Sequence, residues 1–208
     1  MCPANSPPPQ KSMHTHQARA LILGSTSLYR KELLSRLRIP FDVAAPHVDE
    51  TPLPNEAPKA LALRLALAKA RAVALLHPLA VVIGSDQVAD LDGHPLGKPG
   101  HHANAILQLQ SMRGKTVIFQ TALSVVCLAS GFEKTDFAEV KVKFRKLSDE
   151  EIESYLLAET PYDCAGSAKS EGLGITLLES IESDDPTALI GLPLIRTCQL
   201  LREAGIQV

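Results

Sequence analysis

The first half of the chain alternates short apolar runs with segments of helical periodicity, and this alternation constrains the fold more than any other feature. Residues 20–23 form an apolar run and residues 81–84 are rich in β-branched residues, so both runs predict buried strands. Between them, residues 58–77 consist mostly of Ala and Leu. Pro58 opens this segment and Pro78 follows it, which is the pattern of a helix with proline at its first position. Strands that alternate with helices predict an α/β fold.

Shorter signals extend the same pattern. A helix is expected to begin near Ser27 and to stop at Pro40, and residues 41–45 predict a second strand. The Asp92-Gly93 pair predicts a turn or a small hairpin after the third strand.

The second half predicts an antiparallel hairpin. Residues 116–128 and 137–144 alternate, are rich in β-branched residues and are separated by a segment that contains Gly131. Together with the strands of the first half, this hairpin predicts a mixed β-sheet flanked by helices.

Three further helices are expected. Residues 103–112 are helical in pattern, and Ser148 with Glu151 forms a capping-box signal for a helix that follows. Residues 187–203 predict a closing helix, which Pro193 is expected to kink or break.

Composition is that of an ordinary globular protein, with 45% hydrophobic and 21% charged residues among 208. The net charge of −2 argues against nucleic-acid or anionic membrane partners, because binding to these needs a dense basic surface. No apolar run approaches the length of a membrane helix. The four cysteines are scattered, which fits a reducing compartment, although an even count also allows two disulfides. We therefore predict a cytoplasmic protein.

The chain is expected to form one domain with a tail. Residues 1–18 contain three consecutive prolines and no apolar segment, so they predict a disordered tail rather than a signal peptide. Residues 19–208 show no repeat and no linker, and they predict a single domain.

Small polar residues and an arginine follow the first strand. Ser25 and its neighbours lead into the expected helix, and Arg30 lies in its first turn. A helix N-terminus binds phosphate through its free N–H groups, and arginine adds a forked, permanent positive charge. The spacing of a Walker A loop is absent. The same residues also fit a helix N-cap followed by a surface arginine.

Two acidic residues are candidates for metal or water chemistry. Asp86 follows the predicted strand of residues 81–84, at the end where α/β folds place their ligands, and it can bind a divalent cation or activate water. Glu50 lies in a proline-rich acidic loop and can serve as a metal ligand or as a partner of Arg30. Each acid also has an ordinary interpretation, as a turn cap and as part of a solvated loop.

Two lysines and a further acid complete the candidates. Lys69 is a single cation in a helix of Ala and Leu, where it can reach a cleft or extend to solvent. Lys98 stands between a glycine and a proline, a position that suits a phosphate contact or an ordinary turn. Glu171 lies in the glycine-rich segment 164–174 and can accept hydrogen bonds from a nucleobase.

Taken in order, these motifs resemble the Maf family of nucleotide pyrophosphatases. The resemblance runs from about Arg19 to the C-terminus and rests on LILGSTSLYRKELL, VDETP, LALAKA, IGSDQV, GKP, CAGSAKSEGLGI and GLPL. It implies a Maf/ITPase-like fold, with two lobes around a nucleotide cleft. It also implies hydrolysis of a nucleoside triphosphate to the monophosphate and pyrophosphate.

The resemblance further implies a role for each candidate. Asp86 would be the catalytic residue that activates water or holds a metal, and Glu50 would assist with the metal or the water. The cofactor would be a divalent cation, Mg²⁺ or Mn²⁺, and a homodimer is expected. The triphosphate would be bound by Ser25, Arg30, Lys69 and Lys98.

Base specificity separates two branches of the family. Tyr29, Gln87 and Glu171 resemble the branch that hydrolyses 7-methyl-GTP, whereas the branch acting on dTTP and UTP tends to have Thr at position 87. A purine methylated at N7 is cationic, which favours an aromatic ring and a nearby carboxylate. Two alternatives stay open. One is a dTTP/UTP pyrophosphatase, and the other is a nucleotide-binding regulator of septum formation with little catalysis.

Overall fold

The computed structural model describes residues 19–208, and the predicted disordered tail lies outside the described residues. The strands are β1 (Leu21–Gly24), β2 (Asp42–Ala44), β3 (Val81–Leu91), β4 (His94–Leu96), β5 (Thr116–Cys127), β6 (Phe132–Phe144) and β7 (Leu178–Glu182). The helices are α1 (Leu28–Ser35), α2 (Pro58–Leu76), α3 (His102–Met112), α4 (Asp149–Glu159) and α5 (Leu194–Glu203).

The strands form one mixed sheet, as the sequence predicted. Within residues 19–208 it contains seven strands in the order β2-β1-β3-β5-β6-β7, with β4 paired to β3. Strands β2, β1 and the first part of β3 are parallel, and the other pairs are antiparallel. The expected α/β class is therefore confirmed.

Strand β3 is longer than its apolar run predicted. The apolar run predicted that this strand ends at Gly84, but β3 continues to Leu91 because β5 pairs with it from Val82 to Asp90. Asp86 therefore lies inside the strand, and the prediction that it stands beyond the strand end was wrong. The length of the neighbouring strand β5, and not the local apolar run, therefore decides where β3 ends.

The other differences have similar causes. Strand β6 begins at Phe132, earlier than predicted, and the mostly exposed edge strand β7 was not predicted because it has no apolar alternation.

Two local signals are confirmed. The closing segment breaks at Pro193, as expected. A 3₁₀ turn at Ala188–Ile190 precedes it, and α5 follows it. The capping box of Ser148 and Glu151 opens α4, which confirms that local signal.

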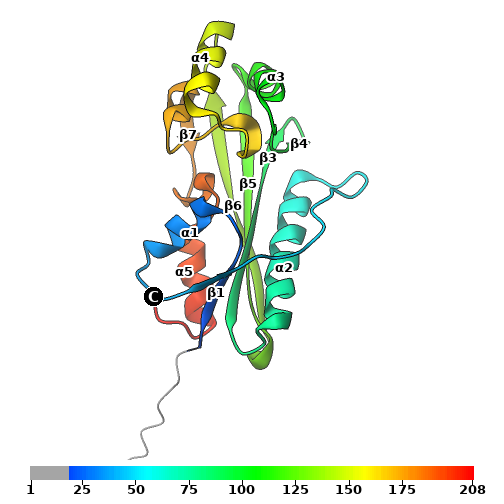
Figure 1. Cartoon of the computed structure of the whole chain (residues 1–208), viewed down its shortest axis with the longest axis vertical. Coiled ribbons are helices and arrows are strands. Elements are labelled where there is room, and N and C mark those ends of the chain that lie inside the picture. Colours follow the sequence, from blue (N-terminus) through cyan, green and yellow to red (C-terminus); the bar gives the residue numbers. More distant parts are fainter. Residues whose placement is uncertain (1–18) are drawn as a thin grey trace, which may run out of the picture.

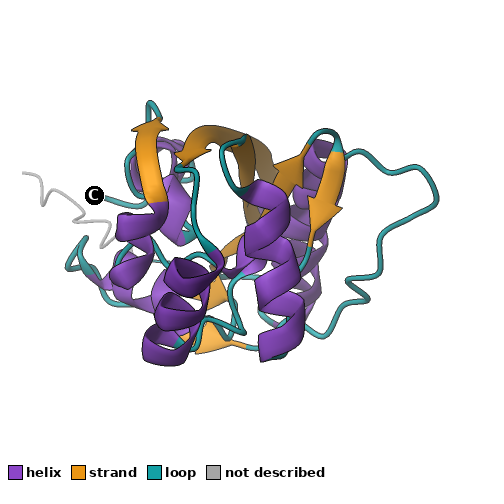
Figure 2. Ribbon diagram, turned by 90° about the horizontal axis from the view of Figure 1, so that it is seen from above, coloured by secondary structure: helices purple, strands orange, loops and turns teal. Residues whose placement is uncertain are grey.

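The helices cover the sheet so that two lobes form. Helix α2 packs on one face of β3 and β5. On the opposite face, α1 and α5 bury Leu33 and Leu201 at one end of the sheet, while α3 and α4 bury Leu109 and Leu156 at the other end. The long strands β3, β5 and β6 run through both ends (Figure 1). The loop between β2 and α2 extends away from the body of the molecule (Figure 2).

A glycine in β3 allows α2 to approach closely. A Cβ atom on Gly84 would lie 2.3 Å from the carbonyl oxygen of Ala66 and 2.4 Å from the amide nitrogen of Ala70. Both are backbone atoms of α2, so they cannot move aside without shifting the helix. This contact fixes the separation of α2 and β3, and it thereby places Lys69 beside Asp86.

We expect Gly84→Ala to lower the free energy of unfolding by about 1–3 kcal/mol, the usual cost of overpacking a core. Denaturant unfolding measures this change. Gly97→Ala is the matched control, because nothing lies within 4 Å of a Cβ atom placed there. Equal stabilities of the two variants would show that α2 does not depend on this close approach.

Candidate active site

A cavity of about 980 Å³ lies beside the middle of β3. Strand β1 pairs with β3 as far as Gly84, and β4 pairs with it from Ala89 onward. In the part of the chain that the structure describes, Ser85 to Val88 thus have no strand partner on this edge. The cavity occupies the gap, and its volume suits a small-molecule ligand.

The backbone of β3 also faces this gap. The amide nitrogen of Val81 donates to the carbonyl oxygen of Ala20, on the β1 side of the strand. Because peptide groups along a strand alternate between its two edges, those of Ser85 and Gln87 point to the same side as that of Val81. The gap therefore offers backbone donors and acceptors as well as side chains.

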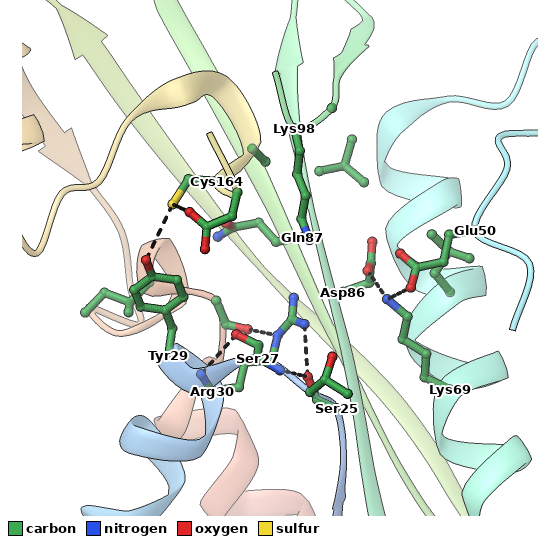
Figure 3. Close-up of a pocket in the computed structure, with 18 of the residues that line it drawn as sticks. Ser25, Ser27, Tyr29, Arg30, Glu50, Lys69, Asp86, Gln87, Lys98 and Cys164 are labelled. Atoms are coloured by element: carbon green, nitrogen blue, oxygen red, sulfur yellow. Dashed lines mark hydrogen bonds and ion pairs between the residues drawn. The ribbon is translucent and has the colours of Figure 1, made fainter. Parts of the chain in front are cut away.

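Asp86 and Gln87 divide the cavity into two sides. Successive side chains of a strand point to opposite faces of the sheet. Asp86 points toward α2, and Gln87 points toward the turn at residues 188–190, as Figure 3 shows.

On the α2 side, one lysine lies between two carboxylates. Nζ of Lys69 is 2.7 Å from Oδ1 of Asp86 and 2.9 Å from Oε1 of Glu50. Lys69 and Asp86 are buried, whereas 58% of the Glu50 side chain is exposed. Glu50 therefore pairs with Lys69, and the alternative that it pairs with Arg30 was wrong. The three groups together carry one net negative charge.

The two carboxylates fit a divalent cation. Mg²⁺ typically binds one or two carboxylates together with water and phosphate oxygens, and it rarely sits in a cage made only of protein. Among residues 19–208, no group of three acidic, histidine or cysteine side chains forms such a cage. Glu50 and Asp86, which both contact Lys69, are the pair of carboxylates on the α2 side of the cavity that fits such binding.

Ser25, Ser27 and Arg30 form the start of α1. Oγ of Ser27 accepts a hydrogen bond from the amide of Arg30 at 3.4 Å, which confirms the predicted N-cap. Oγ of Ser25 accepts from Nη1 of Arg30 at 3.4 Å, and Nε of Arg30 donates to Gly191 O at 2.8 Å. Burial lowers the pKa of Arg30, while Asp86 and Glu50 act in the opposite direction. The guanidinium stays charged at neutral pH and is not a free surface group.

Lys98 reaches the cavity from the loop after β4. Its side chain extends between Gln87 and Asp86 (Figure 3), and within residues 19–208 it makes no hydrogen bond or ion pair. It is therefore free to meet an anion. This one cavity is lined by all the candidate site residues predicted from the sequence, namely Ser25, Tyr29, Arg30, Glu50, Lys69, Asp86, Gln87, Lys98 and Glu171.

On the other side of the cavity, Gln87 holds a turn that the sequence analysis did not recognise. Its Nε2 donates to Oγ1 of Thr121 at 2.9 Å and to the carbonyl oxygens of Ala188 and Leu189 at 2.9 and 3.0 Å. Among the described residues, Oε1 of Gln87 has no hydrogen-bond partner and remains as an acceptor. The GLPL motif, which includes Gly191, was the available signal for this turn.

Tyr29 contacts both a thiol and a cation. Sγ of Cys164 donates to Oη of Tyr29 at 3.9 Å, and Nζ of Lys169 lies 5.6 Å from the centre of the ring. Burial raises the pKa of Tyr29 to about 12, and the neighbouring Cys164 adds to the shift. Burial likewise raises the pKa of Cys164 to about 12, so this thiol is protonated at neutral pH.

A glutamate that the sequence analysis missed anchors the segment carrying Glu171. Oε1 of Glu159 pairs with Nζ of Lys169 at 3.0 Å, and Oε2 accepts from the amide of Leu173 at 2.8 Å. A Cβ atom on Gly172 would lie 2.7 Å from this carboxylate, so the glycine makes room for it. Glu171 itself is exposed at the rim of the cavity.

Comparisons with known proteins show which chains this one is similar to. The sequence pattern described as Maf-like protein matches residues 20–204. A curated relative from Albidiferax ferrireducens, named 7-methyl-GTP pyrophosphatase, is 70% identical over 190 residues, which cover 91% of this chain and 96% of the relative. A relative of the same name from a Polaromonas species is 69% identical over 192 residues, which cover 92% of this chain and 88% of the relative.

Among solved structures, the chain is similar to the Ham1 protein of Staphylococcus aureus. The TM-score is 0.45 at 16% identity, over 62% of this chain and 73% of that one. No helix of residues 19–208 has the length and apolar character needed to cross a membrane. Because the family pattern covers nearly all of the described chain, and full-length relatives share more than half of its residues, the chain belongs to the Maf family.

Proposed function

We propose that this protein hydrolyses a nucleoside triphosphate, 7-methyl-GTP in particular, to the nucleoside monophosphate and pyrophosphate. The observation that carries the proposal is the convergence of Glu50, Lys69 and Asp86 at the gap in β3, with Arg30 and Lys98 facing the same cavity. Membership of the Maf family and relatives named 7-methyl-GTP pyrophosphatase support it.

The phosphate chain would lie across the gap in β3, between Lys69 on α2 and Arg30 at the start of α1. Arg30, Lys69 and Lys98 supply three positive charges, and Ser25 adds a hydroxyl donor near the N-terminus of α1. Ion pairs hold Lys69 and hydrogen bonds hold Arg30 before substrate arrives, and such preorganised charges stabilise the charge that develops in phosphoryl transfer.

Asp86 is the proposed base for the attacking water. Its carboxylate accepts the proton of the water while the water oxygen bonds to the α-phosphorus. The bond from the α-phosphorus to the bridging oxygen breaks, and pyrophosphate leaves with the electron pair. Lys69 orients this carboxylate by its 2.7 Å contact.

Glu50 and Asp86 would also hold the divalent cation, Mg²⁺ or Mn²⁺, on their free carboxylate oxygens. When bound, such an ion offsets negative charge on the phosphate oxygens. The chain itself contributes the carboxylates of Glu50 and Asp86 and the buried amine of Lys69 to this site.

The base would lie on the Gln87 side. Oε1 of Gln87 is an available acceptor for the N–H groups of a guanine, and the acidic side chains of Asp163 and Glu171 line the same side. Both carboxylates attract a cationic 7-methylguanine. Lys169, close to the Tyr29 ring, has its charge balanced by Glu159.

We expect Glu171→Gln to lower kcat/KM for 7-methyl-GTP about fivefold to tenfold, and that for GTP less than about twofold, because only the methylated base is cationic. Steady-state kinetics on both substrates measures the ratio. Glu179→Gln, on the exposed strand β7 outside the cavity, is the matched control. An equal loss of kcat/KM for 7-methyl-GTP and GTP would show that Glu171 does not recognise the methylated base.

The experiment that tests the function is pyrophosphate release from a panel of nucleoside triphosphates with Mg²⁺ or Mn²⁺. Preference for 7-methyl-GTP over GTP supports the proposal in full. Cleavage of dTTP or UTP instead would support the proposed reaction but show that 7-methyl-GTP is not the preferred substrate. Nucleotide binding without pyrophosphate release would favour the regulator of septum formation.

Domain organisation, cellular location and oligomeric state are further parts of the proposal. We propose that residues 19–208 form a single domain, because the two lobes share strands β3, β5 and β6. The cytoplasmic location and the homodimer stay predictions, and light scattering in solution tests the latter.

A further inference from the structure

The cavity wall around Lys98 is built from two loops that are distant in sequence. Residues 97–100 follow β4 and carry Lys98, and residues 162–174 follow α4 and carry Cys164 and Glu171. Under the proposed function, the first loop meets phosphate and the second meets the base. Their relative position therefore decides whether both sides can bind one nucleotide.

One side chain of α3 joins these loops. Nε2 of Gln108 donates to the carbonyl oxygen of Gly97 at 3.0 Å, and Oε1 of Gln108 accepts from Oγ of Ser167 at 2.6 Å. An amide group is suited to this because it has a donor and an acceptor side by side. Gln108 thus contacts the residue directly before Lys98 and the buried centre of the second loop.

The partners of Gln108 have little freedom to rearrange. Ser167 is fully buried and has a φ of 55°, a left-handed conformation that is uncommon for a residue other than glycine. The hydroxyl of Ser167 makes its side-chain hydrogen bond to Gln108. The carbonyl oxygen of Gly97 also accepts from the amide of Gly166, at the longer distance of 3.4 Å.

The outer ends of the two loops are fastened separately. The amide of Gly100 donates to the carbonyl oxygen of Tyr162 at 3.1 Å, and Nδ2 of Asn104 donates to the carbonyl oxygen of Pro99 at 3.0 Å. Loss of the Gln108 contacts would thus leave the segment at Gly97 and Lys98 held only by the longer bond from the amide of Gly166, while the rest of the wall stays attached.

We propose that Gln108 is a positioning residue for Lys98, and that it couples the position of this lysine to the loop that faces the base. The inference rests on the proposed function, because it assumes that Lys98 contacts the phosphate chain. Gln108 itself is not among the residues that line the cavity, so it would act through Lys98 rather than by touching the substrate.

A double-mutant cycle tests the inference. Gln108→Ala is expected to lower kcat/KM about tenfold, the size expected for losing two ordinary hydrogen bonds. In a Lys98→Met background, the same change should cost less than about twofold, because its effect passes through Lys98. Gln108→Glu keeps an acceptor for Ser167 but presents a carboxylate oxygen to Gly97 O, and it should resemble Gln108→Ala.

The control is Gln110→Ala, on the same helix, where the side chain contacts Asp149 away from the cavity. It should leave kcat/KM within about twofold of the starting enzyme, since Ala is well tolerated in a helix. An equal loss from Gln108→Ala in both backgrounds, or no loss in either, would overturn the inference.

The same cycle is run on the dissociation constant of pyrophosphate, measured by calorimetry. This readout does not require turnover, so it tests Gln108 even if no nucleotide is hydrolysed. Loss of the Gln108→Ala effect on pyrophosphate binding in the Lys98→Met background would support the inference. Additive effects would overturn it, and they would do so without bearing on the reaction proposed.

Discussion

Asp86→Asn is expected to reduce kcat/KM for the preferred nucleotide by at least about a thousandfold, because it removes both a base and a charged ligand. Asn has nearly the same shape, and its amide oxygen can still accept from Nζ of Lys69, so the fold should be retained. Pyrophosphate release measures the loss, and circular dichroism checks the fold.

Asp92→Asn makes the same chemical change at the exposed turn between β3 and β4, where φ is 55° and Asn is well tolerated. This control should keep full activity. Retention of more than about a tenth of the activity by Asp86→Asn would exclude Asp86 as the base, since such groups contribute larger factors.

Lys69→Met is expected to lower both stability and activity. Lys69 and Asp86 are buried, and removal of one partner of a buried ion pair leaves the other charge uncompensated, at a cost of about 3 kcal/mol. Activity should fall at least about a hundredfold, because the carboxylates lose their orienting group and the phosphates lose a cation. Denaturant unfolding and steady-state kinetics give the two values.

The double variant Lys69→Met with Asp86→Asn separates these effects. With neither charge present, most of the lost stability should return, while activity stays lost. Lys59→Met, on the same helix, removes a cation that lies 3.4 Å from the centre of the Phe137 ring, and should cost about 0.5–1 kcal/mol. No recovery in the double variant would mean that Lys69 stabilises the fold by packing rather than by charge.

Local signals predicted where the helices begin better than where they end: α1 was expected to continue to Pro40, and it ends at Ser35. The proline at the start of α2, the Ser27 cap of α1 and the capping box of Ser148 with Glu151 all involve residues within one turn of each other. Such contacts are encoded by spacing alone. Strand ends were predicted poorly, as β3 and β6 show, because a strand extends as far as its neighbours pair with it.

In the cavity too, local patterns predicted some features and long-range contacts decided others. Motif order identified the residues of the cavity, but not the partners they take. Lys69 was predicted to bind phosphate, and in the structure its amine already contacts Asp86 and Glu50. Gln87 was predicted to recognise a base, and its donor atom is occupied by the turn at residues 188–189.

The sequence by itself therefore determined the family, the elements of the first half and the residue types that meet in the cavity. Tertiary structure alone decided that the cavity lies at an unpaired edge of β3, that Gly84 brings Lys69 against Asp86, and that Gln108 links the loops around Lys98. The physical reason is separation along the chain. Pairing between strands and packing of a helix on a sheet join residues that no local pattern relates, and only the folded chain fixes those distances.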